Sequence, residues 1–446
     1  MNDSIAKAIT NFSDMLGMPL FILIIGGGLF FLIYSGFVPF RYYLRAIKSL
    51  KGGDSDAPGQ ISSFEALTSA IAATVGMGSI SGVAVAITMG GPGAIFWMWV
   101  SAIVGMATKF FEGSLTIMYK DKDSAGVFQG GPMYVITKGL GPKWKPMAIF
   151  FSIFGLIGTL CLWQANQLTE AITSILLKQT SLEGGFYLNL FIGVVICILV
   201  SIVVLGGIKR ISKVASKVVP IMVALYFILV GYIIVTNFTS VPLVFSQIFS
   251  EAFNFKAGAG GILGSAVIIG VRRAMLVNEA GVGTASMMHG ASKNNQPVKE
   301  GLVAMIGPSI DSGLICTLTA IAILINGDYQ IGTTQGIEIA MNSFERSIPG
   351  LGSYLLMVMV VIFAFSTMFS YSYYGVKCTN FLFGAKYANY YNYFFLFMLI
   401  IGAVVSLDIV VGVVDSAYAL MAVPTMVSMF ILAPKVKKEM KKYFEK

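Results

Sequence analysis

Long apolar runs separated by short polar clusters make up most of the chain. Runs such as Leu20–Leu32 and Ile192–Leu205 are almost continuously hydrophobic, and about 20 such residues let a helix cross ~30 Å of hydrocarbon. Breaks at glycine, proline and charged residues divide the runs into eleven predicted transmembrane helices. They lie near Met18–Phe40, Ser63–Met89, Pro92–Tyr119, Pro146–Leu177, Phe186–Gly206, Ser212–Asn237, Gly258–Gly290, Pro297–Ile325, Leu351–Gly384, Tyr391–Leu407 and Ile409–Ala433.

This pattern predicts an all-α polytopic membrane protein. A transmembrane β-barrel is excluded because its strands alternate apolar and polar residues over about ten positions. The composition excludes an ordinary soluble protein: 56% of the residues are hydrophobic and 11% are charged, whereas about a quarter of the residues of soluble domains are charged.

Basic residues alternate between the loops and thereby predict the orientation. Lysine and arginine beside a span are retained on the cytoplasmic side. The loops around residues 41–51, 120–145 and 209–217 and the tail after Lys435 are strongly basic, whereas the intervening loops are not. We therefore expect a protein of the cytoplasmic membrane with its N-terminus outside and its C-terminus inside. The basic tail suits anionic lipid, and we expect no nucleic-acid partner.

An odd number of helices permits one peripheral helix followed by two five-helix halves of opposite orientation. Such inverted repeats are common in secondary transporters. The predicted segments are 1–62 for the peripheral helix and a basic loop, 63–238 for the first repeat, 239–257 for an extracellular connection, 258–433 for the second repeat and 434–446 for a basic cytoplasmic tail. Each repeat is expected to begin with a helix that is broken in the middle of the membrane.

The stretch from Ala72 to Ser79 is the predicted break in the first repeat. Its glycines allow the backbone to leave helical geometry, which exposes N–H and C=O groups that a buried ligand can satisfy but lipid cannot. Half-helix N-termini attract anions, and free carbonyls attract cations. Close helix packing through small residues is the alternative. A second interrupted segment, containing residues 270–273 and 278–283, favours a binding site.

Several ionisable residues lie within the predicted spans, where each costs about 2.5–3.5 kcal/mol unless it has a partner or water. Lys109 and Glu112 lie three positions apart on one helix face, so we expect them to neutralise each other. Glu279 fits a network at the cytoplasmic end or a ligand contact, and Asp311 fits a structural acid or an aid to ion coupling. The sole histidine, His289, is expected to be solvated at a helix end.

Two polar clusters interrupt later spans. Gln164 and Asn166 carry amides that donate and accept hydrogen bonds, which suits a zwitterionic solute, although interhelical hydrogen bonding explains them equally well. Ser366 and Thr367 place two hydroxyls within one turn of the Phe363 carbonyl. Hard oxygen ligands of this kind suit sodium, and back-bonding within the helix is the alternative.

An enzymatic function is not expected. A single histidine leaves a serine triad or a histidine metal centre incomplete, and the sequence has no phosphate-binding loop for ATP. We expect no organic cofactor. Three tyrosines beside Lys377 fit an aromatic belt at the membrane interface, namely Tyr371, Tyr373 and Tyr374.

Five motifs carry a resemblance to a known family. They are Gly90–Val100, Gly105–Phe110, Gly130–Tyr134, Asn278–Gly281 with Gly283, and Ser372–Gly375. In these motifs, and along essentially its whole length, the chain resembles the alanine or glycine:cation symporter family of prokaryotes. The resemblance implies a leucine-transporter-like fold with a peripheral first helix, sodium-coupled uptake of small neutral amino acids, and a site between the two broken helices.

The resemblance also implies roles for individual residues. Backbone amides around the glycines of the first break would bind the substrate carboxylate, and Gln164 would assist them. The residues implied for sodium are Ala72, Val75, Phe363, Ser366 and Thr367. The predicted substrate site consists of Gly76, Met77, Gly78, Ser79, Gln164, Ser265, Ile269 and Gly270.

Three of these residues depart from the family's usual pattern. Met77 and Ser79 stand where the family usually has threonine and asparagine, which removes oxygen ligands for a second cation. Ile269 stands where the family often has tryptophan, which would enlarge the pocket.

We therefore expect a secondary active symporter that imports a small neutral amino acid of the alanine or glycine type together with sodium, by alternating access. One alternative is a proton-coupled carrier that uses Glu279, Asp311 or Glu65 as its titrating group. Another is a sodium symporter for a larger neutral amino acid such as glutamine. A channel or a receptor fits less well, because the sequence offers two interrupted helices and no soluble domain.

Overall fold

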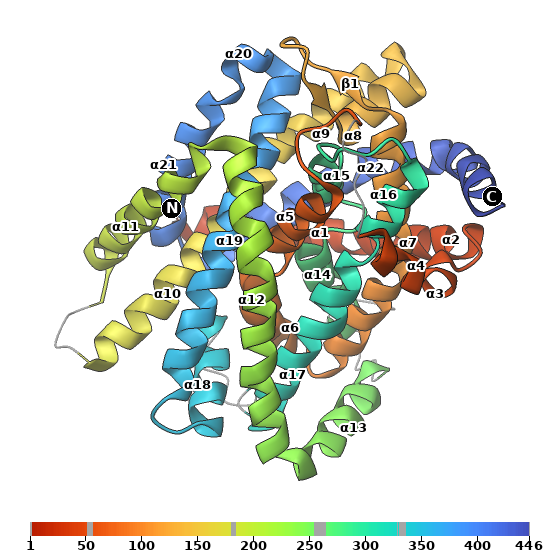
Figure 1. Cartoon of the computed structure of the whole chain (residues 1–446). Helices are drawn as coiled ribbons and strands as arrows, with labels where there is room; N and C mark the ends of the chain where they lie inside the picture. Colours follow the sequence, from red (N-terminus) through yellow and green to blue (C-terminus); the bar gives the residue numbers. More distant parts are fainter. Residues whose placement is uncertain are drawn as a thin grey trace.

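The computed structural model describes residues 2–50, 57–179, 184–253, 265–327, 329 and 336–445. These residues form helices joined by short loops, together with one antiparallel hairpin of β1 (Asp121–Lys122) and β2 (Phe128–Gln129). Figure 1 shows the helices as one bundle, with α13 and α18 at one end and the β1 hairpin and α20 at the opposite end. The start of the seventh predicted span, residues 258–264, lies outside the described part of the chain.

The helices of the first half are interrupted in several places. The α-helices are α1 (Asn2–Phe21), α2 (Gly27–Tyr34), α3 (Val38–Arg41), α4 (Tyr43–Ser49), α5 (Ser63–Thr74), α6 (Val83–Gly90), α7 (Gly93–Met118), α8 (Pro132–Tyr134), α9 (Lys145–Gly158), α10 (Leu162–Gln179), α11 (Phe186–Val204), α12 (Gly207–Thr236) and α13 (Val241–Ala252). The π-helical segments are η1 (Ile22–Gly26), η2 (Gly78–Gly82) and η3 (Val135–Leu140), and the 3-10 segments are η4 (Pro142–Trp144) and η5 (Phe238–Ser240).

The second half begins with a helix pair on either side of a turn. Its helices are α14 (Ser265–Asn278), α15 (Thr284–His289), α16 (Pro297–Ala304), the π-helical η6 (Ser309–Ile315), α17 (Cys316–Leu324), α18 (Ile337–Ser347), α19 (Gly352–Phe383), α20 (Ala385–Ala388), α21 (Tyr390–Val404) and α22 (Leu407–Phe444).

The all-α class is confirmed, but the number of spans is not. Within the described ranges, nine helices are long and apolar enough to cross a membrane, and the bent pair of α5 with η2 and α6 raises the number to ten. The span that is missing from this number is the seventh predicted one, Gly258–Gly290, which contains α14 and α15, of 14 and 6 residues. Neither helix alone reaches the ~20 residues that a span requires.

Several helices extend beyond the predicted segments or are interrupted within them. Helix begins at Asn2, well before the predicted Met18. The fourth predicted span is divided between α9 and α10, where Cys161 has a φ of +55°. The predicted extracellular connection contains helix α13. The basic tail continues α22 to Phe444. Apolar windows detect where a helix crosses lipid, but not how far it continues in water or at the interface.

Candidate functional site

The first repeat begins with a helix that is broken as predicted. Helix α5 starts at a capping box, in which the backbone N–H of Ser62 donates to Glu65 and the backbone N–H of Glu65 donates to Ser62 (2.8 and 3.2 Å). The segments on either side of the break meet at a bend of 51°. Glu65 therefore serves to start the helix.

The break releases a backbone carbonyl. In a continuous helix the N–H of Gly76 would donate to Ala72, but here it donates to Thr74 (2.9 Å). The Ala72 oxygen instead accepts a hydrogen bond from the Thr367 hydroxyl at 3.0 Å, and the Ser366 hydroxyl lies 3.5 Å away. The break therefore turns a helix carbonyl toward two hydroxyls on α19.

The same hydroxyls approach a second carbonyl. Ser366 and Thr367 donate to the Phe363 oxygen at 2.9 and 3.0 Å. The four oxygen-bearing residues are all buried, with exposures of 0 to 3%. Two carbonyl and two hydroxyl oxygens thus converge, which is a donor set that suits a hard cation. Val75, the fifth residue predicted for sodium, is buried in the break itself.

Gly76 is required by a close approach. A Cβ built on this residue would lie 2.0 Å from the Thr367 hydroxyl oxygen, which is far inside van der Waals contact. The glycine predicted to loosen the backbone therefore also lets the break pack directly against the hydroxyl pair on α19.

One of the two places predicted for the second break is not broken. Residues 270–273 are helical within α14, so the interruption predicted there was wrong. A Cβ on Gly270 would lie 2.4 Å from the carbonyl oxygen of Ala94 on α7. This glycine therefore permits close helix packing.

The interruption predicted at residues 278–283 is confirmed. Helix α14 ends at Asn278, and three residues with positive φ follow before α15, namely Glu279 (+52°), Gly281 (+86°) and Gly283 (+95°). The two breaks contact each other, because a Cβ on Gly78 would lie 3.4 Å from Val277 at the end of α14.

Glu279 is the centre of a buried network at the second break. Its carboxylate accepts hydrogen bonds from Thr284 (2.5 Å), Tyr418 (3.3 Å) and Tyr371, and Tyr371 also bonds Tyr418 (2.5 Å). This carboxylate is thus held by hydroxyls from three helices. The aromatic-belt interpretation was wrong, because Tyr371, Tyr373 and Tyr374 are at most 5% exposed.

Two other charged residues have partners that the sequence did not reveal. Besides the attraction of Lys109 on the same helix, the Glu112 carboxylate accepts a hydrogen bond from the backbone N–H of Gly281 at the second break (2.5 Å). His289 is not solvated: it is 1% exposed, and its Nδ1 lies 2.7 Å from Glu300. Glu112 and Gly281 are 169 residues apart, and His289 and Glu300 lie on two successive helices, so periodicity within one helix gives no sign of either contact.

Trp163 connects the two broken helices and was not identified from the sequence. Its indole N–H donates to Ser81 (3.0 Å), whose hydroxyl donates to the Met77 carbonyl (2.9 Å). The Arg273 guanidinium of α14 lies over the same indole, 5.5 Å from the ring centroid, in cation–π contact. The neighbouring Gln164 is buried, 5% exposed.

Other polar residues predicted near the site have structural contacts. Asn166 donates to the Val405 carbonyl at 2.7 Å, which supports the interhelical interpretation. The Ser79 carbonyl accepts a hydrogen bond from Thr319 (2.8 Å). Asp311 is fully buried, and its Oδ2 has no hydrogen-bond partner among the described residues. The side chain of Ser265 lies outside the described residues.

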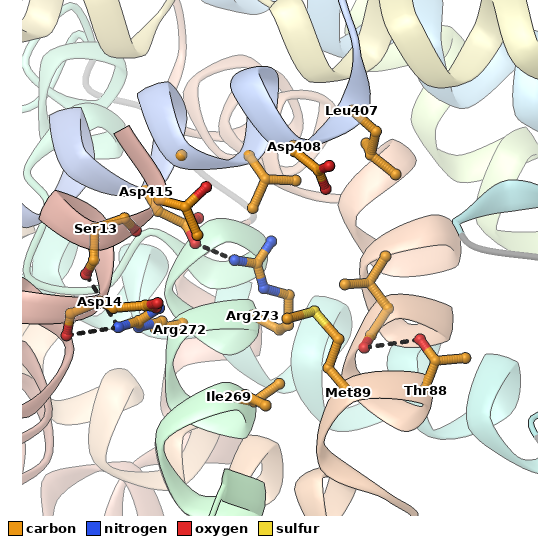
Figure 2. A pocket seen from close by; sticks show the side chains of 14 residues that line it. Ser13, Asp14, Thr88, Met89, Ile269, Arg272, Arg273, Leu407, Asp408 and Asp415 are labelled. Atoms are coloured by element: carbon orange, nitrogen blue, oxygen red, sulfur yellow. Dashed lines mark hydrogen bonds and ion pairs between the residues drawn. The ribbon is translucent and has the colours of Figure 1, made fainter. Parts of the chain in front are cut away.

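A pocket of about 100 Å³ lies between α6, α14, α22 and α1. Ile269 lines it, together with Val85 and Met89 of α6. Figure 2 shows Arg273 reaching from α14 to Asp415 on α22, while Arg272 points to Asp14 on α1. Gly82 lies three residues before Val85 in the first broken helix. It is buried, and a Cβ on it would meet no atom within 4 Å. Space for a side chain is therefore present beside Gly82 of the first broken helix.

The two arginines of this pocket differ in their surroundings. Arg273 and Asp415 form an ion pair with both side chains 4% exposed, and Arg273 Nη1 and Asp415 Oδ1 have no hydrogen-bond partner among the described residues. Arg272 pairs with Asp14 at 2.8 Å, but Asp14 is 63% exposed. The buried pair thus keeps one donor and one acceptor unused beside the pocket.

The comparison with known proteins identifies the family. Residues 2–446 match the model of the sodium:alanine symporter family. The chain belongs to this family. It is 37% identical over 441 residues to the sodium/alanine symporter AgcS of Methanococcus maripaludis, covering 96% of this chain and 95% of AgcS. It is 33% identical over 432 residues to the "Probable sodium/glutamine symporter GlnT" of Bacillus subtilis, covering 95% and 87%.

Solved structures confirm the fold of this symporter-family member. The transporter MhsT, in complex with L-phenylalanine, superposes with a TM-score of 0.57 at 15% identity, covering 85% of this chain and 98% of MhsT. The inward-facing conformation of Mhp1 gives 0.52 at 14% identity, covering 86% and 81%. The leucine-transporter-like fold implied by the motifs is therefore present, in a multi-pass protein of a symporter family.

Proposed function

We propose that this protein imports a small neutral amino acid, of the alanine or glycine type, together with sodium by alternating access. The observation that carries the proposal is the released Ala72 carbonyl, which faces two hydroxyls of α19 across the first break. A secondary transporter needs a cation site that exists only when two parts of the bundle are together. An oxygen cluster shared between a broken helix and a helix packed against it meets that requirement.

Sodium is bound, in this proposal, by the carbonyls of Ala72, Val75 and Phe363 and by the hydroxyls of Ser366 and Thr367. Because both hydroxyls already contact both α5 and α19 oxygens, a cation there would hold the two helices together. Loss of the cation to the cytoplasm would free α5 to move. Sodium binding thus controls which side of the bundle is open.

The amino acid is bound beside the first break. The backbone N–H groups beside Gly76, those of Met77 and Gly78 at the N-terminal end of the second half-helix, attract its carboxylate, while the Gly76 N–H already donates to Thr74. Gln164 follows Trp163, which is bonded to that half-helix through Ser81, and in this proposal its amide assists in binding the substrate. The further residues proposed to line the site are Ser79, Ser265, Ile269 and Gly270.

The ion pair between Arg273 and Asp415 is the proposed extracellular gate. It lies beside the pocket between the broken helices, on the side that the loop charges predict to be extracellular. Opening requires α14 and α22 to separate.

The energy of one sodium ion suffices for accumulation. Moving one charge through 100 mV contributes about 2.3 kcal/mol, and each tenfold concentration ratio of a neutral solute requires about 1.4 kcal/mol. The membrane potential alone therefore supports more than a tenfold gradient, and a sodium concentration gradient adds to it.

The test is the double variant Ser366→Ala/Thr367→Ala in proteoliposomes. We expect it to lose sodium-stimulated alanine uptake, because both hydroxyl ligands are gone. The matched control is Thr379→Ala on the same helix, whose hydroxyl bonds only the Gly375 carbonyl of α19 (2.9 Å). Unchanged sodium dependence of the double variant would contradict the assignment of the sodium site.

A larger neutral amino acid such as glutamine is the second candidate substrate. Ile269 lines the pocket between the broken helices, and one relative is named as a sodium/glutamine symporter. Competition of radiolabelled alanine uptake by a panel of neutral amino acids separates the two candidates. Stronger competition by glutamine than by glycine would favour the larger substrate.

A further inference from the structure

A second polar pocket lies at the opposite end of the bundle from α13 and α18 (Figure 1), on the predicted cytoplasmic side. Its volume is about 310 Å³, and it is bounded by the β1–β2 hairpin, the junction of α11 and α12, the end of α19, and α20 and α21. This size is at the lower end of the range for small-molecule sites. None of the residues proposed for sodium or substrate lines it.

A buried lysine without a counter-ion contact lines this pocket. Lys377 is 2% exposed, and its ammonium has no hydrogen-bond partner among the described residues. It lies 4.8 Å from the ring centroid of Tyr373, a contact that satisfies none of its three N–H donors. Burial without a partner disfavours the charged form of a lysine, so an anionic group beside Lys377 would stabilise its ammonium.

Asp123, an acidic residue that lines the pocket, already accepts hydrogen bonds from other groups of the protein. Asp123 accepts hydrogen bonds from the backbone N–H groups of Ala125 (2.9 Å) and Val127 (3.0 Å) and from the amides of Gln129 (2.6 Å) and Asn380 (2.8 Å). Burial by itself would raise the pKa of Asp123, but these four donors hold it below its ordinary value. The carboxylate stays charged and closes the hairpin, and it makes no contact with Lys377.

The pocket also offers acceptors without donors. The amide oxygens of Gln129 and Asn392 have no hydrogen-bond partner among the described residues, and both side chains are 5% exposed. The orientation of the Gln129 amide follows from its nitrogen, which donates to Asp123 and leaves the oxygen directed elsewhere. An unused cation and two unused carbonyl oxygens therefore line the same pocket.

We propose that this pocket is a second binding site, for a small zwitterionic amino acid on the cytoplasmic side. The carboxylate of the ligand binds Lys377, and its ammonium group donates to the oxygens of Gln129 and Asn392. A simple inorganic anion would satisfy the lysine but leave both amide oxygens unused. This site is independent of the sodium cluster, so its occupancy does not require sodium.

The test is calorimetric titration of the purified full-length protein with L-alanine in a sodium-free choline buffer. We expect saturable binding to the wild type. Lys377→Met should weaken it by roughly tenfold or more, because a charge-assisted hydrogen bond is lost, whereas Lys377→Arg should retain most of it. Equal binding by wild type and Lys377→Met would overturn the proposal, as would the absence of sodium-free binding.

A second arm distinguishes a zwitterion from a simple carboxylate. We expect acetate to bind more weakly than alanine, and Asn392→Leu to weaken alanine binding while leaving acetate binding unchanged. Acetate binding as tightly as alanine would overturn the ammonium contacts. The double variant Ser366→Ala/Thr367→Ala should keep the sodium-free binding, so failure of the proposed sodium site and failure of this pocket give different results.

Discussion

At the scale of single residues, Gly76 determines whether the first break and α19 can share an ion. Its missing side chain allows the Thr367 hydroxyl to approach, since a Cβ would lie 2.0 Å from that oxygen. The same hydroxyl contacts the released Ala72 carbonyl. The absence of a side chain at Gly76 therefore allows the broken backbone to contact the proposed sodium ligands.

We predict that Gly76→Ala lowers the apparent affinity for sodium by roughly tenfold. Overpacking a close contact costs about 1–3 kcal/mol, and here the displaced group is a proposed ligand. The control is Gly231→Ala in α12, where a Cβ would meet no atom within 4 Å. Titration of alanine uptake with sodium measures the apparent sodium affinity of both variants. A sodium dependence in Gly76→Ala equal to that of Gly231→Ala would contradict the close-approach argument.

At the scale of helices, two ion pairs tie α14 to its neighbours with different strengths. Arg273 joins it to Asp415 on α22, and both side chains are 4% exposed. Arg272 joins it to Asp14 on α1, which is 63% exposed. Removal of one partner of a buried pair leaves an uncompensated charge, whereas an exposed pair contributes little.

We predict that Asp415→Asn destabilises the purified protein by about 3–5 kcal/mol, and Asp14→Asn by less than about 1 kcal/mol. The double variant Arg273→Met/Asp415→Leu should recover much of the loss, because neither charge remains. Denaturation of the three variants in detergent, monitored by size-exclusion chromatography, compares their stabilities. Similar stabilities for Asp415→Asn and Asp14→Asn would show that the Arg273 pair is not effectively buried.

The two breaks show what sequence reasoning about helices can and cannot reach. The first was predicted because Gly76 and Gly78 lie mid-span with no other turn signal. An interruption was wrongly predicted at residues 270–273. Gly270 instead allows close packing against Ala94 of a distant helix, and the sequence around Gly270 does not reveal that neighbour. Glu279 adopts a positive φ without being glycine, and its carboxylate is held there by Thr284, Tyr371 and Tyr418, which come from three helices.

At the scale of the whole molecule, the fold followed from hydropathy and motifs, whereas the connections between distant elements did not. The Trp163 contacts with Ser81 and Arg273 join spans more than 80 residues apart in sequence. The burial of His289 against Glu300 likewise depends on how α15 and α16 pack. Such contacts require three-dimensional placement, because no spacing within one helix encodes them.

These connections join the proposed sodium cluster, the proposed substrate site and the proposed outer ion pair of Arg273 and Asp415 in one bundle. The first break contacts α19 through Thr367 and α14 through Val277, and α14 carries Arg273 to Asp415. A cation that draws α5 and α19 together therefore acts on a helix assembly that includes the outer pair. Coupling between ion and solute is expected from this shared packing.

The most direct test of the central claim is alanine accumulation by the wild-type protein in proteoliposomes under an imposed gradient. An inward sodium gradient should drive accumulation of alanine above its external concentration, and equal sodium on both sides, with no membrane potential, should give equilibration only. Accumulation driven by a pH gradient in the complete absence of sodium would contradict the account.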